Sequence, residues 1–192
     1  MKIKAVERLT DYKHLNLYSI QYTDRVDNER LWYLASRNDP PRCVSGNFDT
    51  PDAVIIVALH RARARLVVIK EFRVPLGGYQ YGFPAGLVDD GETIEAACRR
   101  ELYEETGLSV DKVIKVSPPV YSSSGMTDES VSMVYVECSG EISNTGNSSS
   151  EDIYPFLVSP EEALSLCRQP DYPVDVKTWL VLSGFGETGR VV

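Results

Sequence analysis

Residues 86–108 read GLVDDGETIEAACRRELYEETGL, and this stretch decides the fold. We expect a helix from about Thr93 to Thr106, because the next residue, Gly107, is of the type that commonly ends helices. At about 100° per residue, Glu101 and Glu105 project to the same side of this helix. They share that side with an apolar stripe formed by Ile94, Cys98 and Leu102.

These two carboxylates break two ordinary rules of helix composition. They interrupt the apolar side of the helix, and they lie near its last turn, where the helix dipole disfavours negative charge. Carboxylates clustered against a core are costly unless a cation pairs with them, and oxygen ligands favour a hard cation such as Mg²⁺ or Mn²⁺. From the residues alone, a metal site and an ordinary charged helix end both remain open.

The segment resembles the Nudix box, G-x5-E-x7-R-E-U-x-E-E-x-G-U, where U is a bulky apolar residue. Every specified position matches, and composition alone gives such a match a chance of order ~10⁻⁹ per starting position. The matching residues are Gly86, Glu92, Arg100, Glu101, Leu102, Glu104, Glu105, Gly107 and Leu108.

The resemblance implies an α/β fold, an α/β/α sandwich, that hydrolyses nucleoside diphosphates linked to a second group with Mg²⁺ or Mn²⁺. It makes Glu101 and Glu105 the main metal ligands. Glu104 would be an additional ligand and also a catalytic residue. Arg100 would be a catalytic residue that orients the glutamates. Glu92, which we group with Gly86 among the substrate-binding residues, would support the helix or reach a metal through water.

A narrower resemblance covers residues 71–92, EFRVPLGGYQYGFPAGLVDDGE, which are similar to the ADP-ribose pyrophosphatase branch of the family. It implies that the Ala85 carbonyl binds a metal and that Arg73 contacts substrate, although Arg73 could equally be a surface charge. Many branch members carry an acid where this chain has Gly82. Despite this difference, the resemblance makes a small-molecule nucleoside diphosphate sugar the expected substrate, with ADP-ribose leading and GDP-mannose as an alternative.

The loops after the box supply the remaining candidates for the chemistry. The branch often has a mobile loop that ends in a glutamate acting as general base or outer metal ligand, which maps to Glu151. Glu129 is the competing catalytic residue, since it ends another loop. Pro118–Pro119 stands where ADP-ribose enzymes typically have a proline, or is a plain strand-breaking pair.

The first third of the chain predicts an additional N-terminal antiparallel β-sheet. Residues 14–24 and 30–37 are the expected strands. We expect residues 1–48 to form this layer, a dimerisation element of a homodimer, and residues 49–192 to form the hydrolase domain. In the branch such a sheet supplies aromatic rings to the nucleobase, which points to Trp32 and Tyr33, whose other interpretation is ordinary strand packing.

Coarse patterning places the other elements. We expect loops at 71–81, 82–91, 121–129 and 140–150, and a mobile tail at 184–192. The expected strands are 53–59, 66–69, 112–120, 130–138 and 152–158, and the expected helices are 160–167 and 174–182.

Composition narrows the functional classes. The 192 residues carry a net charge of −8, which makes nucleic acid an unfavourable partner. No apolar run approaches the length of a membrane span, and the four cysteines are widely separated, so we expect a soluble, cytoplasmic protein without a membrane partner. A non-catalytic ligand sensor on the same fold and a scaffolding protein with an incidental acidic helix end are the remaining alternatives.

Overall fold

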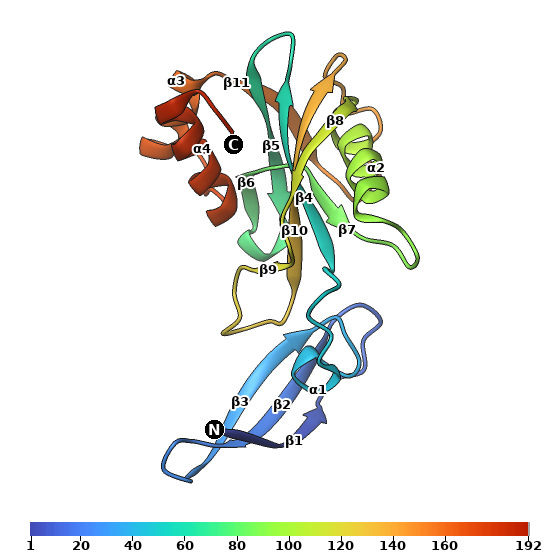
Figure 1. Ribbon diagram of the computed structural model, residues 1–192, viewed down its shortest axis with the longest axis vertical. Coiled ribbons are helices and arrows are strands. Elements are labelled where there is room, and N and C mark those ends of the chain that lie inside the picture. The colour runs from blue at the N-terminus through green and yellow to red at the C-terminus, as the bar shows by residue number, and fades with distance from the viewer. Residues whose placement is uncertain (192) are drawn as a thin grey trace. The chain divides into compact units, whose positions relative to one another are not determined.

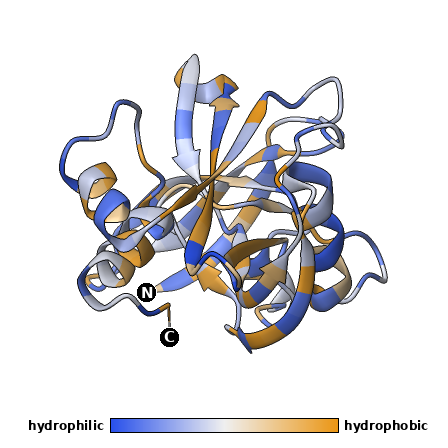
Figure 2. Cartoon of the chain, turned by 90° about the horizontal axis from the view of Figure 1, so that it is seen from above, coloured by the Kyte–Doolittle hydropathy of each residue, from blue (hydrophilic) through white to orange (hydrophobic). Residues whose placement is uncertain are grey.

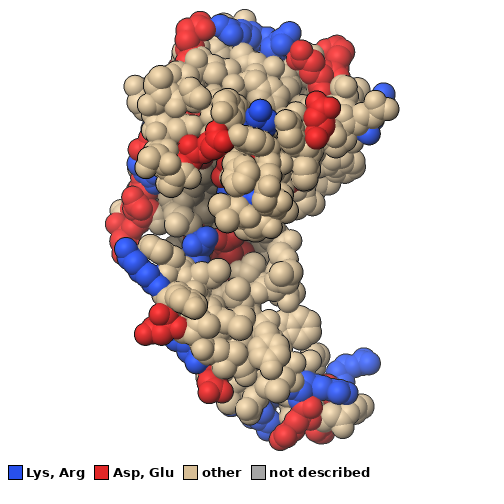
Figure 3. Space-filling view, turned by 180° about the vertical axis from the view of Figure 1, so that it is seen from behind, with Lys and Arg blue, Asp and Glu red and all other residues tan. Residues whose placement is uncertain are grey.

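The computed structural model describes residues 1–191, which divide into two compact units (Figure 1). The first unit contains Met1–Asp52 and Pro119–Val131. The second unit contains Ala53–Pro118 and residues 132–191. On the face shown in Figure 3, acidic and basic side chains are interspersed and do not gather in one patch. In the described part of the chain, no helix is long and apolar enough to cross a membrane.

The first unit is built on a three-stranded antiparallel sheet in the order β1-β2-β3. Its small core is formed by Tyr18, Ile20 and Leu34, against which Val6 packs. The predicted N-terminal sheet is therefore confirmed, although the sequence analysis missed its first strand. The strands are β1 (Lys2–Arg8), β2 (Asn16–Thr23) and β3 (Glu29–Ser36).

A buried arginine holds the rest of the first unit together. Arg42 begins the short helix α1 (Arg42–Ser45) and is only 2% exposed. Its Nη2 donates to Asp52 at 2.8 Å, and its backbone N–H donates to the Asp128 carboxylate at 2.7 Å. Asp52 also accepts the backbone N–H of Ser130 at 2.8 Å. The arginine thus links two segments that are far apart in the sequence.

The second unit contains most of an antiparallel-rich sheet with the central order β11-β5-β4-β10-β8. Within residues 1–191, β6 pairs with β5, β7 pairs with β4, and β9 pairs with the start of β10. The strands are β4 (Ala53–His60), β5 (Arg65–Arg73), β6 (Gly78–Gly82), β7 (Ala85–Leu87), β8 (Ser109–Val116), β9 (Val120–Tyr121), β10 (Ser130–Ser139) and β11 (Ile153–Val158).

Helices cover both sides of this sheet. Helix α2 (Ile94–Thr106) lies on one side, and α3 (Pro160–Arg168) and α4 (Val176–Thr188) lie on the other (Figure 1). Figure 2 shows hydrophobic residues concentrated along the strands between these layers. The core on the α2 side contains Val54, Ile56, Ala58, Val67, Ala97, Cys98, Leu102, Leu108, Val110, Val134, Val136 and Cys138.

Three expected irregular segments are regular in the structure. The expected loop 71–81 continues β5 to Arg73 and then forms β6, because Glu71 pairs with Gln80 across a tight hairpin. The hairpin contains a short 3₁₀ helix, Val74–Leu76, which ends at a left-handed glycine. The expected loop 82–91 contains β7, and α4 continues through residues 184–188 of the expected mobile tail. In the first two cases the segments contain glycine and proline residues, which are typical of turns, so the sequence predicts loops where the structure has paired strands.

Removing the Arg42 side chain should leave the Asp52 carboxylate, which is 9% exposed, without its cation and the Asp128 backbone carbonyl without the Nε donor. We expect Arg42→Ala to lower the free energy of unfolding by about 3–5 kcal/mol, as measured by urea denaturation. Arg25→Ala, at an exposed turn, is the matched control and should change stability by less than about 0.5 kcal/mol. Equal effects of the two substitutions would contradict the stabilising role of Arg42.

Candidate active site

Helix α2 presents its two predicted glutamates to the core. The side chain of Thr93 accepts the backbone N–H of Ala96 at 3.2 Å and so caps the first turn. Gly107 ends the helix with φ of 72°, a left-handed conformation that glycine adopts without strain. The predicted helix is therefore confirmed, and Glu101 and Glu105 lie on its buried face.

The two buried carboxylates have few hydrogen-bond donors. Glu101 is 9% exposed and Glu105 is 5% exposed, and the backbone N–H of Ala85 donates to Glu105 Oε2 at 3.1 Å. Burial raises the pKa of Glu105 to about 9, and the charges of Glu101, Glu71 and Glu151 raise this pKa further. Burial also raises the pKa of Glu101. Burial therefore favours the protonated form of both carboxylates unless a positive charge lies next to them.

Arg100 connects the helix to the loop before it. Its Nε and Nη2 donate to the two carboxylate oxygens of Glu92 at 3.0 and 2.9 Å. Its Nη1 donates to Glu101 Oε1 at 2.6 Å, while Glu104 lies at 3.4 Å and is half exposed. Its Nη2 also donates to the Leu87 carbonyl at 3.0 Å. Arg100 therefore sets the position of the Glu101 carboxylate, and Glu92 holds Arg100 in place.

Gly86 makes room for the same carboxylate. A Cβ atom built on Gly86 would lie 1.9 Å from Glu101 Cδ, far inside contact distance. Gly86 is part of β7 and pairs with Val54 of β4, so its backbone cannot move away without breaking the sheet. Any side chain at this position would displace Glu101.

The donor chemistry of this site fits a hard divalent cation. Within residues 1–191, no three acidic, histidine or cysteine side chains are grouped closely enough to hold a metal as they stand. Glu101 and Glu105 are nevertheless buried carboxylates whose charged forms burial destabilises, and the missing side chain of Gly86 admits the Glu101 carboxylate against β7. A cation is the partner that would stabilise both charged forms.

Glu71 joins this group, although the sequence analysis gave it no role. It lies near the end of β5, and its charge raises the pKa of Glu105. Its carboxylate accepts from Arg73 Nη1 at 2.6 Å, and the Arg73 side chain is half exposed. The strand alternation of Glu71 and Arg73 is the signal that places them on one face, but the proline and glycines that follow predict a loop here.

Glu151 is the loop residue that the structure brings to the carboxylates. Its charge raises the pKa of both Glu101 and Glu105, while its own Oε2 accepts the backbone N–H of Ser148 at 2.9 Å. The preceding loop is attached to α2, since the backbone N–H of Ser143 donates to the Thr106 carbonyl at 2.8 Å. The polar loop 140–150 thus caps the carboxyl end of the helix.

The remaining predicted residues belong to the first unit or border it. Glu129 pairs with Arg37 at 2.8 Å, and Trp32 Nε1 donates to the Gly125 carbonyl at 3.2 Å. Tyr33, next to Trp32 on β3, is exposed. Pro118–Pro119 lies between β8 and β9.

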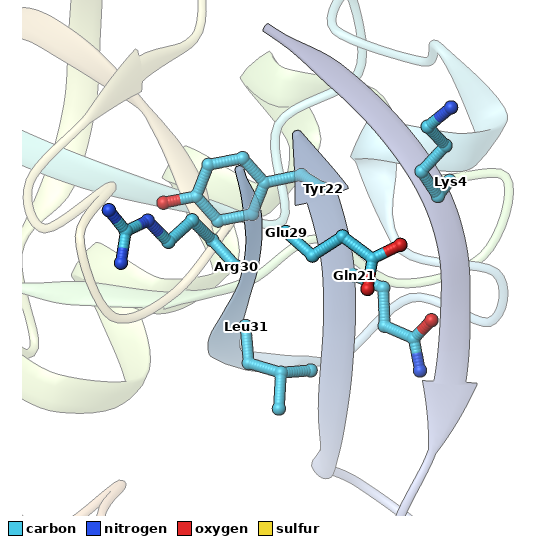
Figure 4. Close-up of a pocket in the computed structure, with 6 residues that line it drawn as sticks. All are labelled: Lys4, Gln21, Tyr22, Glu29, Arg30 and Leu31. Carbon is cyan, nitrogen blue, oxygen red and sulfur yellow. The ribbon is translucent and has the colours of Figure 1, made fainter. Parts of the chain in front are cut away.

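The three-stranded sheet of the first unit carries a pocket of about 320 Å³. Figure 4 shows that Tyr22 and Arg30 project to one side of this sheet. Neither Trp32 nor Tyr33 is among the lining residues, which are Lys4, Gln21, Tyr22, Glu29, Arg30 and Leu31.

Comparison with known proteins identifies the class. The NUDIX domain model matches residues 49–178, which include every residue of the carboxylate site. The chain is 31% identical over 194 residues to the ADP-ribose pyrophosphatase of Saccharomyces cerevisiae, covering 96% of this chain and 82% of that protein. The chain therefore belongs to the NUDIX domain family.

Two further comparisons agree with this assignment. The chain is 30% identical over 142 residues to the ADP-sugar pyrophosphatase of Mus musculus, covering 72% of this chain and 62% of that protein. A crystal structure of an ADP compounds hydrolase superposes with a TM-score of 0.72 at 18% identity, covering 100% of this chain and 96% of that one. The expected Nudix-type fold and the expected class of Nudix pyrophosphohydrolase are confirmed.

The raised pKa of Glu105 predicts how the metal-free protein responds to pH. The unfolded chain loses this proton near pH 4.5 and the folded protein near pH 9, so stability should fall as pH rises between these values. We expect Glu105→Gln, treated with a chelator, to have a higher Tm than the unsubstituted protein at pH 8. The Tm difference should shrink at pH 5, and the same difference at both pH values would contradict the prediction.

Proposed function

We propose that this protein is an Mg²⁺-dependent hydrolase that cleaves the pyrophosphate of ADP-ribose to AMP and ribose 5-phosphate. The observation that carries the proposal is the buried pair Glu101 and Glu105 on the helix of a matched NUDIX domain, with Arg100 fixing the first of them. Burying two carboxylates together is unfavourable for a helix without a cationic ligand, and a metal-dependent hydrolase of pyrophosphates uses such a ligand. This combination favours an enzyme over a scaffold.

The metal would be held by this chain's oxygen donors. We assign Glu101 and Glu105 as its main ligands, with Glu104 and the Ala85 carbonyl as additional ones, and Mn²⁺ as an alternative to Mg²⁺. A bound divalent cation offsets the negative charge of the pyrophosphate and lowers the barrier to attack by water. Arg100 and Glu92 keep the Glu101 oxygen in position, since their hydrogen bonds fix its direction.

The other residues act on the substrate and on the water. Water attacks one phosphorus, the bridging P–O bond breaks, and Glu151 accepts the proton of the water. Glu151 is favoured for this role because its charge acts on both buried carboxylates, whereas Glu129 belongs to the first unit and pairs with Arg37. Arg73, exposed at the end of β5, would bind a substrate phosphate.

The substrate assignment draws on the relatives. The yeast relative is an ADP-ribose pyrophosphatase and the mouse relative an ADP-sugar pyrophosphatase, which supports an adenine nucleotide sugar for this chain. We further propose that the protein is a homodimer in which residues 1–48 form the dimerisation layer. Trp32 and Tyr33 are partly exposed aromatic residues of that layer and would contact the nucleobase.

The substrate is tested by incubating the protein with ADP-ribose and Mg²⁺ and measuring AMP and ribose 5-phosphate by chromatography. We expect stoichiometric formation of the two products, and no products in the presence of a chelator. GDP-mannose and ADP-glucose are the comparison substrates. Cleavage of GDP-mannose without cleavage of ADP-ribose would show that the proposed substrate is wrong, while the assignment as a hydrolase would stand.

The carboxylate pair is tested by substituting one of its members. Glu105→Gln should lower kcat more than about 100-fold, because even outer partners of metal ligands typically contribute 10- to 100-fold. Glu95→Gln is the matched control on the same helix, where Glu95 is exposed and pairs with Arg99, and its kcat should stay within about twofold. Full turnover by Glu105→Gln would show that the metal is held elsewhere.

A further inference from the structure

A tyrosine and an aspartate join two strands beside the carboxylate site. Tyr79 lies on β6, and Asp152 immediately precedes β11. The Tyr79 hydroxyl donates to Asp152 Oδ2, and the backbone N–H of Phe72 donates to the Asp152 carbonyl at 3.0 Å. The hydrogen bond to Asp152 raises the pKa of Tyr79 to about 12, so the hydroxyl keeps its proton near neutral pH. Asp152 is thus held by both its backbone and its side chain.

The Tyr79 ring is itself held by a cluster of aromatic residues around a lysine. Lys70 Nζ lies 4.7 Å from the centroid of the Tyr79 ring, 4.6 Å from that of Tyr154 and 5.5 Å from that of Tyr172. The Tyr79 ring also meets Phe72 edge to face at 5.6 Å. Cation–π and edge-to-face contacts of this kind restrict the ring, so its hydroxyl is presented in one direction.

The pairing of β11 with β5 shows how the hydrogen bond between Tyr79 and Asp152 bears on the position of Glu151. Tyr154 pairs with Lys70 and Ile153 pairs with Glu71, so alternate residues of this segment face opposite sides of the sheet. The hydrogen bond from Phe72 extends the pairing back to Asp152, which therefore shares the aromatic side. Glu151 precedes Asp152 outside the strand, and its charge raises the pKa of both Glu101 and Glu105.

We propose that Tyr79 is a positioning residue which, by holding Asp152 on the aromatic side of the sheet, directs Glu151 toward Glu101 and Glu105. This inference rests on the proposed role of Glu151 as the proton acceptor. Asp152 directly follows Glu151 in the chain, and the Tyr79 hydroxyl donates to its carboxylate from β6. Without that partner, Asp152 is held only by the hydrogen bond from the Phe72 N–H to its carbonyl, so the residue before it is less firmly placed.

The first experiment separates this role from simple packing. Tyr79→Phe keeps the ring and removes the hydroxyl, and we expect about a tenfold lower kcat with KM changed less than twofold. Tyr172→Phe is the matched control, since its ring is in the same cluster and its hydroxyl makes no hydrogen bond within residues 1–191. It should retain full kcat, and an equal loss in both variants would overturn the proposal.

Two substitutions of Asp152 test its role as the acceptor of the hydrogen bond from the Tyr79 hydroxyl. Asp152→Ala should lower kcat as much as Tyr79→Phe does, because the hydroxyl then has no acceptor. Asp152→Asn keeps a carbonyl oxygen that can accept the hydroxyl, and it should recover at least a third of the original kcat. No difference between the alanine and asparagine variants would contradict the hydrogen-bond mechanism.

A double-mutant cycle tests whether Tyr79 acts through Glu151. Glu151→Gln should lower kcat by itself, and adding Tyr79→Phe should then cause no further loss. If the two losses multiply, or if Glu151→Gln keeps full kcat, the proposal is wrong even though the protein is a hydrolase.

Hydrogen exchange followed by mass spectrometry gives a readout that needs no turnover. Tyr79→Phe should accelerate exchange in a peptide covering residues 140–152, whereas Tyr172→Phe should leave it unchanged. Unchanged exchange in Tyr79→Phe would show that the Tyr79 hydroxyl does not hold Asp152 and the loop before it in place. If the protein cleaves no nucleotide sugar but Tyr79→Phe shows this acceleration, the proposed function is wrong and the role of Tyr79 in holding Asp152 stands.

Discussion

The burial of two carboxylates on one face of α2 is the constraint on which the rest of the second unit depends. Glu101 and Glu105 occupy positions that would hold apolar side chains in an ordinary helix. Around them the chain provides an arginine for one and a backbone N–H for the other, and it keeps residue 86 free of a side chain. The pairing of β4 with β7 and the hydrogen bonds from Arg100 to Glu92 and Glu101 both keep these carboxylates next to the sheet.

Much of this arrangement could be predicted because it is local. The spacing of Glu101 and Glu105 on a helix and the end of that helix at Gly107 follow from residues less than one box length apart, and the helix and the family are confirmed. The role of Gly86 was harder to see. A glycine in a motif does not reveal which side chain it admits, and only the packing of β7 against α2 shows that this is Glu101.

The parts that sequence reasoning missed depend on pairing between distant segments. Pro75 and two glycines made residues 71–81 look like a loop, although Glu71 and Gln80 pair across a hairpin. That error concealed Glu71 as a neighbour of the site. Arg42 was missed for a similar reason, since its partner Asp128 is 86 residues away and no local pattern marks Arg42 as buried.

The contact between Arg100 and Glu101 has a consequence for the protein without a bound ion. A guanidinium 2.6 Å from a buried carboxylate acts as a resident counter-ion, so half of the acidic pair is already neutralised by the chain itself. Glu105, with its raised pKa, can carry a proton instead. The chain therefore supplies a positive partner for one carboxylate and a proton for the other, so neither buried group is left as an uncompensated charge when no inorganic ion is bound.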